Sequence, residues 1–328
     1  MEQRTTYAIR IHRTGGPEVM CCEPAEPGDP APGEVRIRHH AVGLNYIDTY
    51  HRTGLYPLPL PSGLGLEGAG IVEAVGAGVT LCAPGDRVAY AGGPVGAYCD
   101  VRCLPADRLL RLPDGIDFET AAGMMLQGLT SAYLLRRTYP VQPGDRVLIH
   151  AAAGGVGLIA CQWAKALGAT VIGTVSTEAK AALARAHGCD HVIRYGQEDV
   201  PARVRALTDG EGVAVVYDGV GRDTFAGSLD SLRVRGMLVS FGNASGPVPP
   251  VDLLQLSQKG SLFLTRPTLA HYTARREELE ALGGELFGMV GSGRVRIAVG
   301  QRYALADVAR AHRDLEARRT TGSTILLP

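Results

Sequence analysis

A glycine-rich turn is the part of this sequence whose residue types and spacing most clearly suit a chemical task. The run HAAAGGVG covers residues 150–157, between the apolar segment RVLI and the amphipathic segment LIACQWAKALG. In such a turn the backbone can approach a phosphate, and the N–H groups at the start of the helix attract its charge. The spacing is that of GxGxxG with Ala152 in the first glycine position, and a tight strand–helix turn without ligand can look the same. Because a predicted strand precedes it and a helix follows, we predict a dinucleotide pyrophosphate site at Gly154, Gly155, Val156 and Gly157.

The residues after the next predicted strand favour NADPH over NADH. NAD sites usually carry an Asp or Glu about 20 residues after the glycines, where it binds the ribose 2′-OH. This chain has GTVSTEAK at residues 173–180, with Ser176 near the strand end and Lys180 a turn later. A hydroxyl and an ammonium group would bind a 2′-phosphate, whereas a carboxylate would repel it. We expect Glu178 to serve helix capping, because it falls in the first helical turn.

Two kinds of segment position these residues. Before Phe118, short apolar runs are separated by Gly and Pro clusters, which is typical of a small β-barrel or sandwich. From Phe118 onward, strands alternate with helices at regular intervals, which indicates a parallel sheet with right-handed crossovers. The last stretch, from about Phe263, contains two helices and a short terminal strand, TILL. We expect that strand to return to the first domain.

The composition argues against several other classes of protein. The 328 residues include 33 basic and 33 acidic side chains, so no net charge favours nucleic acid or an anionic membrane. No run of 18 apolar residues predicts a transmembrane helix, and the first residues lack the pattern of a signal peptide. We therefore expect a cytoplasmic protein. The seven cysteines form no CxxC pair and the nine histidines no HExxH motif, which argues against a disulfide framework or a zinc site.

Four stretches of the sequence are NYIDTYHRTGLYP, HAAAGGVGLIACQWAKALGA, VVYDGVGRDTF and LVSFGNASG. They closely resemble bacterial quinone oxidoreductases, the zeta-crystallin-like, zinc-free branch of the medium-chain dehydrogenase/reductase superfamily, and the likeness covers essentially the whole chain. The resemblance implies an α/β protein with a GroES-like β-rich catalytic domain, residues 1–125 and 264–328. It also implies a Rossmann NADPH-binding domain with a doubly wound parallel sheet, residues 126–263. The active site is expected in the cleft between the domains, and the usual assembly of this family is a homodimer.

The positions of the zinc ligands of related enzymes are altered in this chain. Zinc-dependent relatives have a Cys ligand in the early loop and a GHE motif soon after it. The corresponding residues here are Asn45 and Gly65-Leu66-Glu67, and the four-cysteine loop for structural zinc is missing. Asn and Leu cannot replace a thiolate and an imidazole as zinc ligands. We therefore expect a metal-independent reaction, with Glu67 as a buried hydrogen-bonding or ion-paired group.

The resemblance, carried over residue by residue, implies the other contacts of the cofactor and substrate. The nicotinamide and its ribose would be contacted by Asn45, Tyr46, Asp48 and Thr130. The adenosine 2′-phosphate would be surrounded by Ser176, Lys180, Tyr195 and Arg318. Further cofactor contacts, at the ends of later Rossmann strands, are expected from Val220, Phe241 and Asn243. The substrate-side aromatic residues would be Tyr50 and Tyr56, forming a slot for a flat ring.

The expected function is hydride transfer, or transfer of single electrons, from NADPH to a quinone without metal. Reduction of a quinone produces a weakly basic phenolate-like anion, so orientation and modest hydrogen bonding suffice. Asn45 and Asp48 would fix the nicotinamide ribose, and water or a tyrosine would supply the proton. One alternative is an NADPH-dependent enone or 2-alkenal reductase. Another is an NADPH-sensing or RNA-binding protein, although zero net charge and 5% aromatic residues argue against RNA binding.

Overall fold

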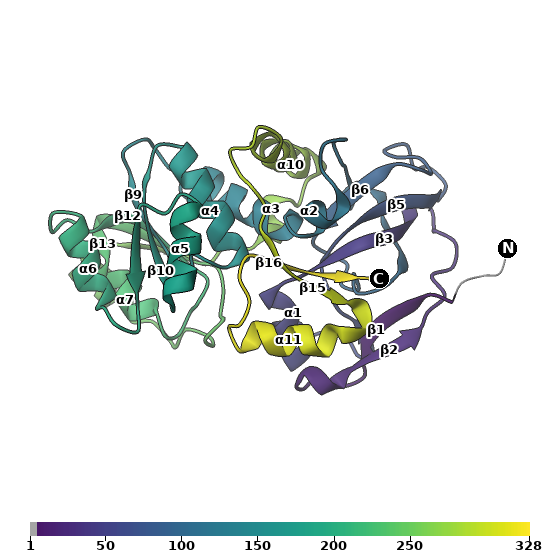
Figure 1. Cartoon of the computed structure of the whole chain (residues 1–328), viewed down its shortest axis with the longest axis horizontal. Coiled ribbons are helices and arrows are strands. Elements are labelled where there is room, and N and C mark those ends of the chain that lie inside the picture. Colours follow the sequence, from purple (N-terminus) through teal and green to yellow (C-terminus); the bar gives the residue numbers. More distant parts are fainter. Residues whose placement is uncertain (1–4) are drawn as a thin grey trace. The chain divides into compact units, whose positions relative to one another are not determined.

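The computed structural model describes residues 5–328, which form two compact units (Figure 1). The first unit contains the chain up to Leu129, with Thr273–Phe287 and Ile297–Pro328, and the second contains Thr130–Tyr272 and Gly288–Arg296. The second unit extends beyond residue 263 because the strand Phe263–Thr265 pairs with the sheet of that unit. The sequence predicts that the Rossmann domain comprises residues 126–263. This stays a prediction, because the compact units describe packing and not function.

A six-stranded parallel sheet forms the centre of the second unit. Its order is β11 (His191–Arg194), β10 (Thr170–Val175), β9 (Arg146–Ile149), β12 (Val213–Asp218), β13 (Leu232–Ser240) and β14 (Phe263–Thr265). In chain order this is 3-2-1-4-5-6, the arrangement of a Rossmann sheet, in which the strand order reverses between β9 and β12 while the strands stay parallel. Ligands of such sheets bind at the carboxyl ends of the strands, near this reversal.

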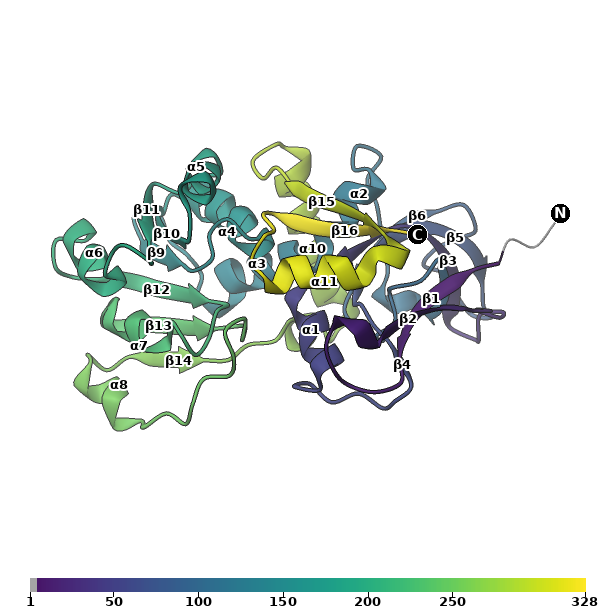
Figure 2. The same ribbon diagram turned by 60° about the horizontal axis from the view of Figure 1, so that its bottom comes forward.

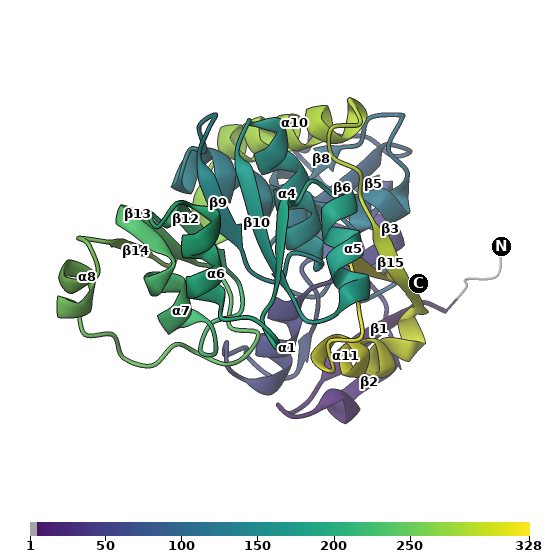
Figure 3. The ribbon, with the colours of Figure 1, turned by 60° about the vertical axis from the view of Figure 1, so that its left-hand side comes forward.

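Helices connect the strands of the second unit. They are α4 (Gly155–Ala166), α5 (Glu178–Ala186), α6 (Val200–Leu207), α7 (Phe225–Asp230) and α8 (Leu254–Gln258). The helices α4 and α5 pack against β9, β10 and β11 (Figure 3). Every residue of β12 is buried, because a central parallel strand is covered on both faces. The continuous apolar run VAVVY in the sequence follows from that burial.

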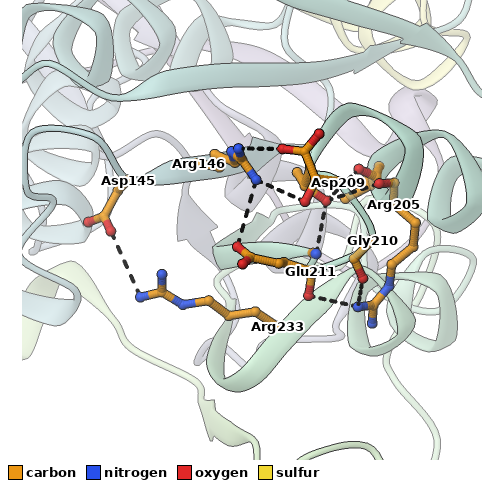
Figure 4. A network of polar contacts seen from close by, with 10 residues as sticks. Asp145, Arg146, Arg205, Asp209, Gly210, Glu211 and Arg233 are labelled. Atoms are coloured by element: carbon orange, nitrogen blue, oxygen red, sulfur yellow. Dashed lines mark hydrogen bonds and ion pairs between the residues drawn. The ribbon is translucent and has the colours of Figure 1, made fainter.

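Charged side chains join the segments at the amino edge of this sheet (Figure 4). Arg146, the first residue of β9, pairs with Asp209 at 2.9 Å and lies 3.8 Å from the Glu211 carboxylate. Arg205 donates to the carbonyl oxygens of Gly210 and Glu211 at 3.0 and 2.7 Å. Exposed ion pairs contribute only about 0–1 kcal/mol each to stability, so these contacts add little to the stability of the sheet.

The first unit is built mainly from antiparallel strands. Its large sheet has the order β15 (Val299–Ala304), β16 (Ser323–Leu327), β3 (Glu34–Leu44), β5 (Glu67–Val75), β6 (Arg87–Ala91) and β8 (Leu110–Arg111), and β7 (Val101–Pro105) also pairs with β3. A smaller sheet contains β2 (Met20–Pro24), β1 (Tyr7–Ile11) and β4 (Ser62–Gly63). The strand β16 contains the segment TILL and pairs with β3, so the predicted return of the terminal strand is confirmed (Figure 2).

Several helices accompany these sheets. In the first unit they are α1 (Tyr46–Thr53), α2 (Phe118–Ala122) and α11 (Val308–Glu316). The helices α3 (Met125–Tyr133) and α10 (Arg276–Gly291) begin in the first unit and end in the second, and α9 (Leu269–Tyr272) belongs to the second. The helix α1 begins directly after β3, because Asn45 is an extended N-cap residue, and it ends at Gly54 in the left-handed conformation. This short helix therefore carries the stretch NYIDTYHRTG that the sequence marks as part of the site.

Candidate active site

The predicted pyrophosphate residues lie in the turn from β9 into α4. Gly154 is the N-cap of α4, and no side chain caps the helix there. The first N–H groups of a helix have no partner within it, so this end can bind an anion. At Gly157 an added Cβ would lie 2.7 Å from Ala152 Cα and even closer to Ala151 O, so the helix and the turn before it approach too closely for any side chain. The glycines thus have the two roles that the fingerprint predicts, open backbone and close packing.

Three of the predicted 2′-phosphate residues lie together at the carboxyl edge of the sheet. Ser176 follows β10, and Tyr195 follows β11, the neighbouring parallel strand. The Tyr195 N–H donates to Val175 O at 3.3 Å, which holds these two strand ends side by side. Thr177 caps α5 by accepting the Lys180 N–H at 3.3 Å, so Lys180 lies in the first turn next to them. The residues that carry a hydroxyl, an ammonium group and a phenol therefore follow neighbouring strand ends at this edge.

Glu178 lies in the first turn of α5, but it is not the capping residue. Its carboxylate pairs with Arg185 at 3.1 Å and with Arg194 at 3.5 Å, while Thr177 makes the cap. The capping interpretation of Glu178 is therefore wrong, because the residue before it has the extended N-cap conformation. Arg194 was not predicted; only the pairing of β11 with β10 brings it here. The local negative charge of Glu178 is thus balanced at the predicted phosphate site.

The loops after β12 and β13 meet at the same edge and contain the other predicted Rossmann contacts. Asp218 ends β12, and its Oδ1 accepts the Val220 N–H at 2.8 Å. The Phe241 N–H donates to Asp218 O at 2.8 Å, and the Ser245 N–H donates to Val220 O at 2.8 Å. Asn243 lies between them in the loop after β13. The strand ends therefore place Val220, Phe241 and Asn243 in one pair of packed loops.

A buried polar network links the central strand ends, and the sequence did not indicate it. His150, after β9, contacts Thr174 Oγ1 with Nδ1 at 2.9 Å and Ser228 Oγ with Nε2 at 3.0 Å. Ser228 and Thr224 donate to the Asp218 carboxylate at 2.8–2.9 Å. Burial lowers the pKa of His150, so the ring is neutral and each nitrogen has one role. The network ties the ends of β10, β9 and β12 together beneath the predicted cofactor edge.

In the first unit, Asn45 joins two buried acids. Its N–H donates to Asp48 Oδ2 at 2.9 Å, and its Nδ2 donates to Glu67 Oε2 at 2.6 Å. Its Oδ1 accepts a hydrogen bond from Gln127 Nε2 at 3.2 Å. The amide is therefore engaged on both sides, and the adjacent Leu66 is a buried apolar residue. This set of donors and acceptors does not fit a zinc ion, which prefers thiolate and imidazole ligands.

Glu67 is a buried hydrogen-bonding group, which confirms the expectation from the sequence. Besides Asn45, it accepts the N–H of Leu126 at 2.8 Å, in the first turn of α3. Burial raises the pKa of Glu67 to about 8, and the bonds from Asn45 and Leu126 act against that shift. Gly43 provides the room, because a Cβ there would overlap the Glu67 carboxylate and Ala122 O. Gln127, which the sequence left open as a substrate contact or a helix cap, bonds to Asn45 and accepts the Ser323 hydroxyl at 2.7 Å.

Asp48 is the second buried acid, with 0% of its surface exposed. Its Oδ2 accepts the Tyr98 hydroxyl at 2.6 Å as well as the Asn45 N–H. Among the residues that the structure describes, no group donates to its Oδ1. Burial raises the pKa of Asp48 to about 7, and the bonds from Tyr98 and Asn45 lower it. A carboxyl group that titrates near neutral pH therefore lies at the start of α1.

Three predicted tyrosines form a continuous aromatic surface along α1 and the loop after it. The Tyr46 and Tyr50 ring centroids are 5.7 Å apart, and the Tyr50 and Tyr56 centroids are 5.1 Å apart at an interplanar angle of 63°. Rings in edge contact at this distance leave no room for a third ring between them. Tyr50 and Tyr56 therefore do not enclose a ring between them, and their expected role in a substrate slot stays a prediction. A flat ring would have to lie against these rings.

Two of the predicted cofactor contacts, Thr130 and Arg318, lie outside the turns and loops described so far. Thr130 is a buried residue of α3 in the second unit, and Arg318 is an exposed residue after α11 in the first unit. Their contribution to the nicotinamide and 2′-phosphate sites stays a prediction. Within residues 5–328, no three His, Cys, Asp or Glu side chains are grouped so that they could hold a metal ion. In the same part of the chain, every helix is too short or too polar to span a membrane.

Family models match both parts of the chain. The alcohol dehydrogenase GroES-like domain matches residues 31–114, and the zinc-binding dehydrogenase family matches residues 155–282. Together with the strand order, these matches confirm the predicted fold class, a GroES-like domain and a Rossmann domain.

Several known proteins are similar over the whole chain. A quinone oxidoreductase of Pseudomonas aeruginosa is 60% identical over 321 residues, which cover 98% of this chain and 99% of the relative. A 2-haloacrylate reductase of a Burkholderia species is 47% identical over 329 residues, with 98% of each chain covered. The crystal structure of Escherichia coli quinone oxidoreductase complexed with NADPH is 52% identical, with a TM-score of 0.97 over 98% of this chain and 100% of that chain.

Proposed function

This chain belongs to the quinone oxidoreductases of the zinc-binding dehydrogenase family, and we propose on this premise that it reduces quinones with NADPH. The observation that carries the proposal is the carboxyl edge of the Rossmann sheet. There the uncapped start of α4 lies on the same edge as Ser176, Lys180 and Tyr195. Positive charge and hydroxyl groups at this edge suit the 2′-phosphate that distinguishes NADPH from NADH.

Bound NADPH would supply the hydride for the reaction. Gly154, Gly155, Val156 and Gly157 would bind its pyrophosphate, and Ser176, Lys180 and Tyr195 would bind its 2′-phosphate, together with Arg318 as the family resemblance implies. Val220, Phe241 and Asn243 would contribute from the neighbouring loops, and Thr130 would contact the nicotinamide. Since hydride transfer depends on orientation, these contacts serve to hold the reacting ring in one place.

The residues of the first unit orient the reacting groups. Asn45, Tyr46 and Asp48 fix the nicotinamide and its ribose, and the aromatic surface of Tyr50 and Tyr56 supports a flat substrate ring. The negative charge that develops on a reduced quinone is spread over the ring, so modest hydrogen bonding stabilises it. This agrees with a site whose residues do not fit zinc, since no strong Lewis acid is required.

A substitution at Lys180 tests the cofactor assignment. We expect Lys180→Met to raise the KM for NADPH by about 10- to 100-fold with 1,4-benzoquinone as acceptor, since a charge-assisted bond to phosphate contributes roughly 1.5–3 kcal/mol. The KM for NADH should stay the same. Lys165→Met is the matched control, because Lys165 pairs with Asp190 on the outer side of α4. Equal losses with both cofactors would contradict the assignment, and no quinone turnover by the unaltered protein, with or without a chelator, would refute the function.

Reduction of other conjugated carbonyls is a second candidate function. A relative that is 47% identical to this chain is a 2-haloacrylate reductase, and a haloacrylate contains a carbon–carbon double bond conjugated to a carboxylate. A small acrylate would need the same hydride donor and the same orienting residues. Comparing kcat/KM for 1,4-benzoquinone with that for 2-chloroacrylate and acrolein decides between the two candidates.

A homodimer is part of the proposal. The edge strand β14 ends the Rossmann sheet, and Phe263 on it is 56% exposed. Leu253 and Leu254, in and next to α8, are 73% and 58% exposed. Open strand edges with apolar side chains favour pairing with another chain. Light scattering after gel filtration should give twice the chain mass, and Phe263→Glu should give a monomer, while Leu81→Glu on the other unit should not.

We also propose a cytoplasmic location. All seven cysteines, which lie within the described residues, are free thiols. Free thiols are usual in reducing compartments. Fractionation of cells that produce the protein tests this directly.

A further inference from the structure

A chain of hydrogen bonds in the first unit runs from Arg52 to Asp48 in a single direction. A guanidinium group can only donate, so Arg52 donates to His312 Nδ1 at 3.0 Å. Burial and the charge of Arg52 lower the pKa of His312 to about 3, so the ring is neutral and carries its proton on Nε2. That nitrogen lies 3.3 Å from the Tyr98 hydroxyl, which in turn donates to Asp48 Oδ2 at 2.6 Å.

The members of this chain are buried and come from distant parts of the sequence. The exposed fraction of Asp48 and His312 is 0%, and that of Tyr98 and Arg52 is 1%. Asp48 and Arg52 belong to α1, Tyr98 precedes β7, and His312 belongs to α11. Two further hydrogen bonds, at 3.1 and 2.6 Å, join Arg52 to Glu316 of α11. The chain therefore fixes both ends of α1 to the rest of the unit.

The direction of the chain makes the two oxygens of Asp48 different. Oδ2 receives both the Tyr98 hydroxyl and the Asn45 N–H, whereas nothing in the described part of the chain donates to Oδ1. Hydrogen bonds to a carboxylate are about twice as strong as those to a neutral group, so the two donors favour the ionised acid. An acceptor oxygen buried without a partner is costly unless a ligand supplies a donor.

We propose that Tyr98 and His312 are positioning residues that keep Asp48 ionised and hold its carboxylate in place through Oδ2. The inference rests on the proposed function, in which Asp48 holds the nicotinamide ribose. It adds two residues that do not touch the cofactor and act through Asp48 alone. The charged and titratable groups around Asp48 are Glu67 from β5, Arg52 from α1, Tyr98, and His312 from α11.

The expected consequence is a shift in pH dependence. Burial already raises the pKa of Asp48 to about 7, and the Tyr98 hydroxyl is the largest influence that lowers it. Without that hydroxyl the acid should stay protonated to higher pH, by about one pH unit for the loss of one hydrogen bond to a charged group. In the unaltered protein, kcat/KM for NADPH should therefore decrease as the pH falls below about 7. In Tyr98→Phe the midpoint of this decrease should lie about one pH unit higher.

A matched variant separates positioning from simple loss of stability. Tyr90 is also 1% exposed, and its hydroxyl bonds to His39 at 3.0 Å, in a different network of the same unit. We expect Tyr90→Phe to lower the melting temperature about as much as Tyr98→Phe but to leave the acid limb of the pH profile where it was. His312→Leu should move the limb in the same direction as Tyr98→Phe. His312→Gln, which keeps one donor and one acceptor, should restore it.

The decisive measurements are pH profiles of kcat/KM with 1,4-benzoquinone and a carbon-13 NMR titration of the Asp48 carboxyl, assigned with Asp48→Asn. An upward shift of both midpoints in Tyr98→Phe and His312→Leu, absent in Tyr90→Phe, supports the proposal. Identical profiles in the two Tyr→Phe variants, or an unmoved Asp48 titration, overturn it. If no quinone is reduced, the proposed function fails, but the NMR titration still decides whether Tyr98 and His312 control Asp48.

Discussion

Two alanine substitutions in the glycine turn should affect different properties: Gly157→Ala should lower stability, and Gly154→Ala should weaken NADPH binding. At Gly157 a Cβ would lie 2.7 and 2.8 Å from the Cα and carbonyl carbon of Ala152, which are backbone atoms that cannot rotate away. Such overpacking costs about 1–3 kcal/mol, near the upper end here, and the better helix propensity of Ala recovers less than about 1 kcal/mol. We therefore expect Gly157→Ala to lose ~2 kcal/mol in the free energy of unfolding, which lowers Tm by about 4–8 °C.

Gly154→Ala provides the comparison within the same turn. Gly154 has φ −81° and ψ 174°, which Ala adopts easily, and the added Cβ would lie 3.2 Å from Ala151 O. We expect a stability loss below about 1 kcal/mol, since Ala is a poorer N-cap than Gly. The dissociation constant of NADPH should rise at least about tenfold, because the methyl group stands where the pyrophosphate approaches. Thermal melts and fluorescence titrations with NADPH measure the two effects. A Gly154→Ala protein that melts like Gly157→Ala and binds NADPH normally would refute the separate roles of these glycines.

Two further predictions concern buried titratable groups. His150→Phe should weaken NADPH binding about tenfold, because it removes the hydrogen bonds to Thr174 and Ser228 that hold the strand ends together. His39→Phe is the control, since it also removes two buried hydrogen bonds but should lower only Tm. Equal NADPH affinity of the two variants in fluorescence titrations would contradict this prediction. Asp48 keeps its proton to about pH 7 when folded but releases it near 3.8 when unfolded, so its contribution to stability is full below pH 3.8 and is lost as the pH rises to 7. Urea unfolding of Asp48→Asn should therefore depend less on pH between 4 and 7 than that of the unaltered protein, and parallel curves would contradict the shift.

Local patterns were sufficient to predict the parts of the fold that depend on neighbouring residues. The run VAVVY of β12 is apolar throughout because both faces of a central parallel strand are covered. The glycine turn was recognisable because Gly157 has no space for a side chain and Gly154 begins a helix. The zinc-ligand positions were also informative, since an amide at Asn45 excludes thiolate chemistry whatever its surroundings.

The polar networks could not be predicted, because they join residues that are remote in sequence. His150 and Ser228 are 78 positions apart, and Tyr98 and His312 are 214 apart. Each of these residues alone has no distinctive spacing, so its partner is known only once the sheet or α11 is in place. The contact between Tyr50 and Tyr56 shows a related limit, because the family resemblance implied two substrate-side aromatic residues but not the angle between their rings.

The place of β16 has a consequence for how the protein is made. This strand lies between β15 and β3, so the sheet of the first unit needs residues 323–327 beside a strand from residues 34–44. During synthesis, β3 emerges early but lacks its neighbour β16 until the end of the chain is made. The strands β9 to β14 of the second unit, in contrast, emerge one after another. Domains generally fold as units while the chain emerges. The ribosome should therefore carry a folded Rossmann unit while residues 42–44 of β3 still lack their partners in β16. Premature stops in the last few codons should yield chains that bind chaperones through this unpaired end of β3.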